Sequence, residues 1–147
     1  MLSIAGTARL VSDLHLRAER PDLTARFADF LADTAAARSE MLFILGDLFE
    51  YWIGDDDLAD PFNAQVCGML RDLANHGTAI CFIAGNRDFL IGETFATAAR
   101  MKLLNDTAKV AVGDTPTLLM HGDTVCSDDI PYQRFRRSKT FSVKQQQ

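Results

Sequence analysis

The sequence predicts an α/β protein in which helices cover the faces of a layered sheet. Apolar, β-branched runs alternate with helical patterns along most of the 147 residues, as expected for strands joined by helices. Two of these runs, residues 41–45 and 78–84, are almost entirely apolar, which is the pattern of strands buried on both faces. A chain of this length, 48% hydrophobic and 24% charged, is composed like one globular domain.

The first part of the chain supplies a strand, a helix and a second strand. Residues 8–12 form a short strand candidate. A helix is predicted over residues 21–38, because apolar side chains recur there at i, i+4, i+7 and i+8, beginning with Leu23. Pro21 suits the first turn of that helix. The apolar run at 41–45 then follows as the second strand.

The rest of the chain continues the same alternation. A helix is predicted over residues 61–76, with apolar side chains on one side and Gly77 as its stop. The apolar run at 78–84 is the next strand, and a shorter helix fits residues 93–100. Two final strands, 109–112 and 117–120, flank the sequence Gly-Asp-Thr-Pro at 113–116, which is typical of a hairpin turn.

Charge, cysteine content and hydropathy exclude several classes of protein. The net charge of −5 argues against a nucleic-acid groove that works by charge alone. The three cysteines lie in no CxxC or Cys/His spacing, so we expect reduced, apolar side chains of a cytosolic protein. The first residues show no secretory signal, and no apolar run approaches the roughly 20 residues of a membrane-spanning helix.

Candidate functional groups gather where the predicted strands end, as they do in open α/β sheets. Asp13 and His15 follow the first strand, spaced to face the same way from an extended segment. The later strands end in Gly46-Asp47, in Gly-Asn-Arg-Asp at 85–88 and in His-Gly-Asp at 121–123. Carboxylate, amide and imidazole groups together suit Mn²⁺, Fe²⁺ or Zn²⁺, and a shared Asp can bridge two ions.

Each of these groups also has an ordinary structural interpretation. Gly-Asp occurs four times in the chain, and a lone Asn is more often a turn residue than a ligand. His76 lies at a helix end, where an imidazole commonly caps the last carbonyls. The acidic run 55–57 is read as a solvated loop rather than a cation site. The aromatic residues Phe49, Tyr51 and Trp52 either cover a substrate or pack the loop onto the core, and the sequence does not decide between these alternatives.

Taken in order, the motifs resemble those of calcineurin-like metallophosphoesterases. They are DLH at 13–15, GD at 46–47, GNRD at 85–88 and HGD at 121–123. Longer stretches, such as ILGDLFEYWIGDDD and MHGDTVCSDD, are similar to the UDP-2,3-diacylglucosamine pyrophosphatases of lipid A biosynthesis. The resemblance therefore implies a metallophosphoesterase-type sheet core with flanking helices.

The resemblance implies a centre with two divalent metal ions, which we expect to be Mn²⁺. It assigns Asp13, His15 and Asp47 to one ion, and Asp47, Asn86 and His121 to the other. The same five residues, together with Arg87, are the expected catalytic residues. Asn86, Arg87 and Asp129 are the expected substrate contacts.

Arg87 stands where most phosphoesterases of the superfamily carry His. A phosphate leaving group needs little protonation, and a guanidinium that never loses its charge is suited to hold phosphate oxygens. The implied reaction is hydrolysis of the pyrophosphate bond of UDP-2,3-diacylglucosamine to UMP and 2,3-diacylglucosamine 1-phosphate. This substrate implies a cytoplasmic enzyme bound peripherally to the inner membrane. Alternatives are a related phosphoesterase acting on a nucleotide or phosphoprotein, and a non-catalytic metal-binding remnant.

The resemblance spans residues 8–137, so we expect residues 1–137 to be the N-terminal part of a metallophosphoesterase domain and 138–147 to be a poorly patterned tail. Members of the family continue with a Gly-His-x-His motif on a later strand, and each of its two histidines completes one metal site. This chain has three histidines in all and lacks that motif and the later strands. We therefore expect a C-terminally truncated protein with weak or no activity alone.

Overall fold

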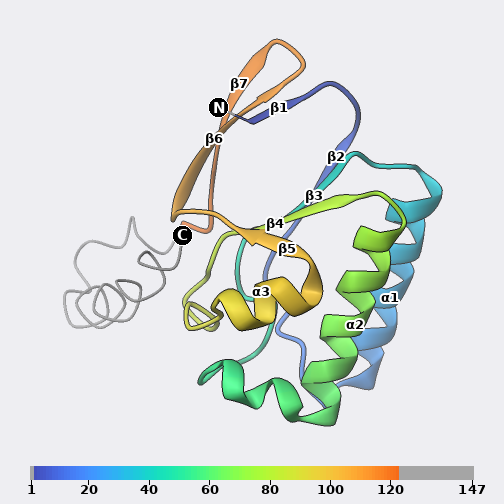
Figure 1. Ribbon diagram of the computed structural model, residues 1–147, viewed down its shortest axis with the longest axis vertical. Helices are drawn as coiled ribbons and strands as arrows, with labels where there is room; N and C mark the ends of the chain where they lie inside the picture. Colours follow the sequence, from blue (N-terminus) through green and yellow to red (C-terminus); the bar gives the residue numbers. More distant parts are fainter. Residues whose placement is uncertain (1, 123–147) are drawn as a thin grey trace.

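The computed structural model describes residues 2–122, which form two β-sheets with helices against one of them (Figure 1). The first sheet has the order β2-β3-β4-β5 and is entirely parallel. Its strands are β2 (Ala8–Val11), β3 (Met41–Ile44), β4 (Ala79–Phe82) and β5 (Met101–Leu103). Because all four strands run the same way, their carboxyl ends lie along one edge of the sheet, where functional groups are expected.

Helices connect the parallel strands, as the alternating sequence pattern predicts. They are α1 (Pro21–Ala36), the short 3₁₀ helix η1 (Asp55–Ala59), α2 (Pro61–Asn75) and α3 (Glu93–Ala99). Proline begins both long helices, where its missing N–H costs no hydrogen bond. The Asp60 carboxylate caps α2 by accepting from the N–H groups of Phe62 and Asn63 at 3.0 and 3.2 Å.

A second sheet, with the order β1-β6-β7, lies on the other side of the parallel sheet. Its strands are β1 (Leu2–Ile4), β6 (Thr107–Val112) and β7 (Thr115–Met120). β6 and β7 form an antiparallel hairpin, and β1 pairs with β6 in parallel. β7 ends at Met120, so His121 follows the hairpin directly.

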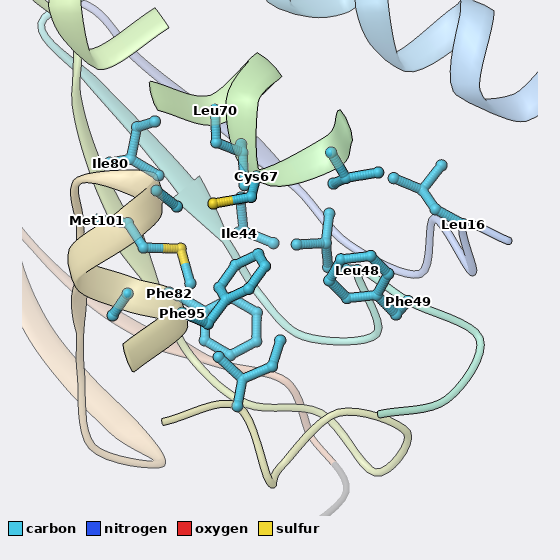
Figure 2. Close-up of a cluster of buried hydrophobic side chains, with 14 of the residues drawn as sticks. Leu16, Ile44, Leu48, Phe49, Cys67, Leu70, Ile80, Phe82, Phe95 and Met101 are labelled. Atoms are coloured by element: carbon cyan, nitrogen blue, oxygen red, sulfur yellow. The ribbon is translucent and has the colours of Figure 1, made fainter. Parts of the chain in front are cut away.

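The parallel sheet is covered on both faces, and the side chains of β3 show how. Leu42 and Ile44 belong to the larger apolar cluster that the helices cover (Figure 2), together with Phe82 and Phe95. The alternate residues Met41 and Phe43 belong to a second cluster shared with β1, β6 and β7. All four residues of β3 are buried, which explains its unbroken apolar sequence.

The structure confirms the predicted α/β class and corrects details. The three-residue strands β1 and β5 are too short to show a pattern, and the sequence analysis missed both. The hairpin turn is shorter than the predicted 113–116, because β7 already begins at Thr115. Pro116 stands opposite Ala111 within the ladder, on a strand that pairs along one side only among the described residues.

The loop after β3 that carries Phe49, Tyr51 and Trp52 packs largely onto the core. Phe49 and Trp52 are buried, with ring centroids 4.7 Å apart, and Phe95 of α3 lies edge-on to both. Tyr51, in contrast, is 63% exposed. Of the two alternatives that the sequence left open, core packing holds for Phe49 and Trp52.

Asp55 ties this loop to helix α3, which corrects its interpretation as part of a solvated acidic run. Its carboxylate accepts from Trp52 Nε1 at 3.0 Å and from the N–H groups of Gly92 and Phe95, both also at 3.0 Å. The last two contacts satisfy N–H groups at the start of α3, which a terminal helix turn leaves without intrahelical partners. Asp55 is therefore a structural residue.

Replacement of Asp55 by Ala is expected to lower the free energy of unfolding by about 2 kcal/mol, since it removes a helix cap and an indole hydrogen bond. Urea titration followed by circular dichroism measures this difference. Asp56→Ala is the matched control, because Asp56 is the exposed neighbour. Equal losses in the two variants would contradict the assigned role of Asp55.

Candidate metal centre

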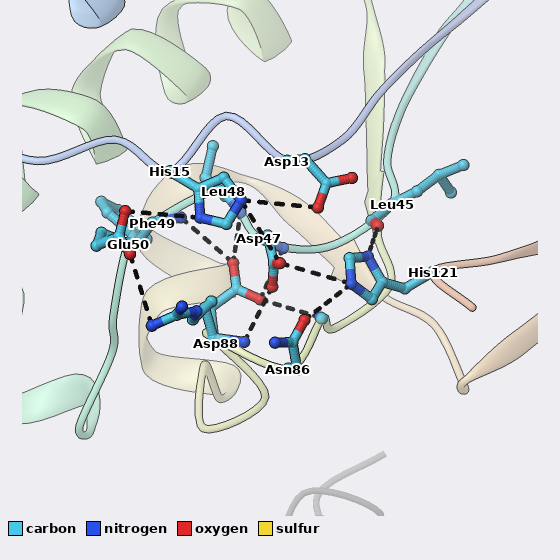
Figure 3. Close-up of polar contacts among 12 residues, drawn as sticks. Asp13, His15, Leu45, Asp47, Leu48, Phe49, Glu50, Asn86, Asp88 and His121 are labelled. Atoms are coloured by element: carbon cyan, nitrogen blue, oxygen red, sulfur yellow. Dashed lines mark hydrogen bonds and ion pairs between the residues drawn. The ribbon is translucent and has the colours of Figure 1, made fainter. Parts of the chain in front are cut away.

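Four chain segments converge at the carboxyl ends of the strands and carry the site residues (Figure 3). Asp13 and His15 follow β2, Asp47 follows β3, Asn86 and Arg87 follow β4, and His121 follows β7. The structure thus brings the expected metal ligands together from segments up to 108 residues apart, from 13 to 121. Asp129, the remaining expected substrate contact, lies outside the described residues.

The backbone at three of these residues is in the left-handed region. Asp13, His15 and Asp47 have φ angles of 58°, 51° and 55°. L-residues adopt this conformation at a cost, and such residues cluster at functional sites. The expectation of an extended segment at Asp13 and His15 is therefore wrong: β2 ends at Val11, and each side chain is presented from a left-handed turn.

Hydrogen bonds hold the first two loops side by side. The N–H of Asp13 donates to Gly46 O at 3.1 Å, that of His15 to Asp47 O at 3.0 Å, and that of Leu16 to Leu48 O at 2.9 Å. These contacts continue the β2–β3 pairing beyond the strands themselves. The spacing between Asp13, His15 and Asp47 is consequently fixed by the backbone.

Two glycines allow the loops after β3 and β4 to approach each other. A Cβ on Gly46 would lie 2.6 Å from Gly85 Cα and 2.7 Å from His121 Nδ1. A Cβ on Gly85 would collide with the Asp47 carboxylate and with its backbone nitrogen, at 2.5 Å from the latter. The glycines that precede Asp47 and Asn86 in the sequence are therefore required for close packing of the site.

The Asp47 carboxylate lies at the middle of the cluster. Its Oδ2 is 3.8 Å from His15 Nε2 and 3.6 Å from His121 Nε2. Asp13 Oδ1 is 3.7 Å from His15 Nε2, and the ligand atoms of Asp13, Asp47 and His121 all lie within 4.8 Å of one another. Burial raises the pKa of Asp47, and the Arg87 N–H, which donates to Oδ1 at 2.9 Å, opposes this rise.

His121 directs its Nε2 atom toward this cluster. Its Nδ1 lies 2.6 Å from the carbonyl oxygen of Leu45, which can only accept, so Nδ1 carries the proton. In the neutral ring Nε2 then has a free lone pair, and it faces Asn86 Oδ1 at 3.1 Å as well as Asp47. The Leu45 carbonyl, directly after β3, thus favours the tautomer that a metal ligand requires.

The donor set fits a divalent cation. Asn86 Oδ1, the Asp47 carboxylate and His121 Nε2 are all acceptors that converge, an arrangement that a cation stabilises. With the amide turned over, the Asn86 NH₂ would donate to Asp47 Oδ1 and Oδ2 at 3.2 and 3.0 Å and to His121 Nε2 at 3.1 Å. The Asn86 amide can therefore donate hydrogen bonds to its neighbours when no cation is bound. In the other orientation it can offer its oxygen to a cation.

Asp88 holds the backbone of the site loops through hydrogen bonds and was not among the expected site residues. It is fully buried at 0% exposure. Its carboxylate accepts from the N–H groups of Asp47 at 3.1 Å, Leu48 at 2.7 Å and Gly85 at 3.0 Å. Burial raises the pKa of Asp88 to about 6, against the effect of these hydrogen bonds. In the sequence, Asp88 is simply one more acidic residue after a strand. Its hydrogen-bond partners are backbone N–H groups, so no residue type in the sequence points to its role.

Glu50 is the second residue that the sequence analysis missed. One of its oxygens lies 2.7 Å from Arg17 Nη1 and 3.7 Å from His15 Nδ1, and the other lies 3.5 Å from Arg87 Nη1. Arg87 is about half exposed. The Arg87 guanidinium is thus held by Glu50 on one side and is open to solvent beside the cluster.

The fold and the site define the class of protein. Residues 9–143 match the model of the calcineurin-like phosphoesterase family, and the chain belongs to this family. The family implies divalent metal ions, in agreement with the acidic and imidazole groups that the structure gathers.

Comparison with curated relatives indicates which proteins of the family this chain resembles. The chain is 51% identical over 128 residues to the UDP-2,3-diacylglucosamine hydrolase of Pseudomonas putida strain W619. The aligned region covers 87% of this chain and 52% of that protein. It is 50% identical over 127 residues to the enzyme of the same name from Edwardsiella ictaluri, with 86% and 48% covered. The chain thus spans about half the length of the curated relatives it matches.

One solved structure supports the fold assignment. The crystal structure of Pseudomonas putida nuclease MPE superposes with a TM-score of 0.50 at 22% identity and covers 66% of this chain and 46% of that one. At this level of identity the likeness concerns the fold alone. Among residues 2–122, the structure contains no helix with the length and apolar character needed to cross a membrane.

Proposed function

We propose that this chain takes part in the metal-dependent hydrolysis of the pyrophosphate bond of UDP-2,3-diacylglucosamine, giving UMP and 2,3-diacylglucosamine 1-phosphate. The observation that carries the proposal is the position of the Asp47 carboxylate between His15 Nε2 and His121 Nε2, at 3.8 and 3.6 Å. About 50% identity to hydrolases with this named substrate supports it.

The proposed ligands form two sets that share Asp47. Asp13, His15 and Asp47 hold one divalent ion, and Asp47, Asn86 and His121 hold the other, with Mn²⁺ as the proposed metal. Ions bound here supply Lewis-acid stabilisation of the charge that develops on phosphoryl oxygens. The chain's own contribution is to hold these groups in fixed positions, through left-handed backbone turns, two close-packed glycines and the buried Asp88 carboxylate.

Arg87 is the proposed phosphate-binding cation. Its backbone N–H donates to Asp47 Oδ1, and its backbone oxygen accepts from the Trp52 N–H at 3.1 Å, so both sides of the residue are anchored beside the cluster. Its guanidinium reaches out to a half-exposed position, where it is available to phosphate oxygens. Because it stays charged, it stabilises a departing phosphate without having to give up a proton.

The proposal extends to the organisation of the chain and to its surroundings. Residues 1–137 are the proposed N-terminal part of a metallophosphoesterase domain. Asp129 is a proposed substrate contact. A diacylated substrate resides in a membrane, so we place the reaction at the cytoplasmic face of the inner membrane, with the protein bound peripherally.

Release of UMP from UDP-2,3-diacylglucosamine by the purified chain, with Mn²⁺ and after chelation, tests this function. We expect slow, Mn²⁺-dependent release that exceeds hydrolysis of 4-nitrophenyl phosphate. Arg87→Gln should lower UMP release about 100-fold, the scale of loss when one charge-stabilising donor is removed.

Arg26→Gln is the matched control, because Arg26 is exposed on α1 and its loss removes the same charge. Faster hydrolysis of the aryl phosphate than of the nucleotide substrate would point to another phosphoesterase. Mn²⁺ binding without hydrolysis of either compound would indicate a metal-binding module instead.

A further inference from the structure

Each of the two site histidines has an oxygen behind its Nδ1 atom, on the side of the ring away from Asp47. For His121 this oxygen is the Leu45 carbonyl at 2.6 Å. For His15 it is Glu50 Oε2 at 3.7 Å. The two imidazoles therefore approach Asp47 through the same atom, Nε2, although their supports differ: a backbone carbonyl for one and a charged side chain for the other.

The Glu50 carboxylate is itself held in place. Arg17 Nη1 donates both to Glu50 Oε2 at 2.7 Å and to the backbone oxygen of His15 at 2.9 Å. The Glu50 N–H donates to Leu16 O at 3.1 Å, which fixes the start of the side chain. One guanidinium nitrogen thus joins the supporting carboxylate to the residue that the carboxylate faces.

We propose that Glu50, held by Arg17, is a positioning residue that holds the imidazole ring of His15 in the orientation in which Nε2 faces Asp47. This inference rests on the metal-dependent function proposed above, since it concerns a ligand of that centre. Asp13 and Asp47 lie beside Nε2 at 3.7 and 3.8 Å, and Glu50 lies beside Nδ1 at 3.7 Å, so the ring is held between carboxylates at both nitrogens. A cation held by His15, Asp13 and Asp47 would take the Nε2 lone pair and leave the proton on Nδ1, where the Glu50 charge favours it.

The contact acts through charge, because 3.7 Å exceeds the length of a hydrogen bond. The carboxylate is also only partly exposed, which limits screening by water. Its second oxygen lies 3.5 Å from Arg87 Nη1. The same side chain therefore links the orientation of a metal ligand to the position of the proposed phosphate-binding cation.

A purely structural role for Glu50 makes a different prediction. Partly exposed ion pairs such as Arg17–Glu50 contribute about 1 kcal/mol or less to stability. Loss of such a pair alone would lower the melting temperature slightly and leave metal affinity and the orientation of the His15 ring unchanged. A positioning role changes both of those quantities.

Two measurements on the full chain test the proposal: calorimetric Mn²⁺ titration, and nuclear Overhauser spectra that report the orientation of the imidazole rings in the metal-free protein. The spectra are tractable because the chain has three histidines. In Glu50→Gln we expect about 10-fold weaker Mn²⁺ binding, as for the loss of other outer-shell partners of metal-bound histidines. We also expect the His15 ring to lose its fixed orientation, while the orientation of the His121 ring remains unchanged.

Glu19→Gln is the matched control, since it removes the same charge from an exposed position on the loop that carries Arg17. Glu50→Ala should weaken Mn²⁺ binding further than Glu50→Gln. Unchanged affinity together with an unchanged orientation of the His15 ring would overturn the inference. The ring orientation is measured without metal or substrate, so a change in Glu50→Gln would support the inference even if the chain released no UMP.

Discussion

Replacement of Asp47 by Asn is expected to lower the affinity for Mn²⁺ at least 100-fold. The carboxylate is the group shared by both proposed ligand sets, and its Oδ2 lies within 4 Å of both Nε2 atoms, at 3.8 Å from His15 and 3.6 Å from His121. An amide keeps the shape but loses the negative charge, which hard and borderline divalent ions require from their ligands. Calorimetric titration of the metal-free protein measures the loss.

The same substitution should not destabilise the metal-free protein. Burial raises the pKa of Asp47, so the folded state disfavours its ionised form relative to the unfolded chain. At neutral pH the ionised carboxylate therefore costs stability, and an uncharged Asn avoids that cost. Asp47→Asn should unfold at the same urea concentration as the parent chain or at a higher one, when both are measured with a chelator present.

Asp114→Asn serves as the control, because Asp114 is exposed in the hairpin turn and its loss changes the net charge equally. It should bind Mn²⁺ as the parent chain does. If Asp47→Asn kept its affinity within about threefold of the parent, Asp47 would not be the shared ligand. A large loss of stability in Asp47→Asn would show that the buried carboxylate is stabilising, which would contradict its role as a charge held for a cation.

The convergence of the candidate site residues could be predicted from the sequence because these residues follow patterns that the sequence displays. Asp47 and Asn86 come directly after buried apolar strands, and the carboxyl ends of parallel strands meet at one edge. His121 follows the second strand of a hairpin with a clear turn. The order of these residues along the chain was sufficient to place them together, without knowledge of any side-chain contact.

The supporting residues could not be predicted in the same way. Glu50 pairs with Arg17, 33 residues away. Asp88 accepts from the N–H of Asp47, 41 residues away, as well as from that of nearby Gly85. An interaction with backbone N–H groups leaves no complementary residue type in the sequence. The left-handed turns at Asp13 and His15 were missed for a related reason, because Asp and His rarely signal this conformation as glycine does.

Replacement of Asp88 by Asn is expected to lower the free energy of unfolding by about 2 kcal/mol near pH 4. Its two oxygens accept from three backbone N–H groups within 3.1 Å, those of Asp47, Leu48 and Gly85, in a fully buried position. Asn offers one acceptor oxygen, and its NH₂ would face N–H groups that it cannot satisfy. A buried donor left without a partner costs about 1–3 kcal/mol. At neutral pH the relief of removing a buried charge offsets much of this cost, so the loss is expected to be largest at low pH, where the carboxyl of the parent chain is protonated. Urea titration in the presence of a chelator measures the difference, with Asp114→Asn as the exposed control.

The dependence of this difference on pH separates the hydrogen bonds from the buried charge. Burial raises the pKa of Asp88 to about 6 in the folded state, from 3.8. The folded protein therefore binds this proton more readily than the unfolded chain, so the contribution of Asp88 to stability rises as the pH falls from about 6 to about 3.8. The amide introduced by Asp88→Asn would not titrate, and the stability gap between this variant and the parent chain should widen over that range. A gap that narrows instead would mean that the three N–H groups hold the carboxylate ionised more strongly than burial opposes it.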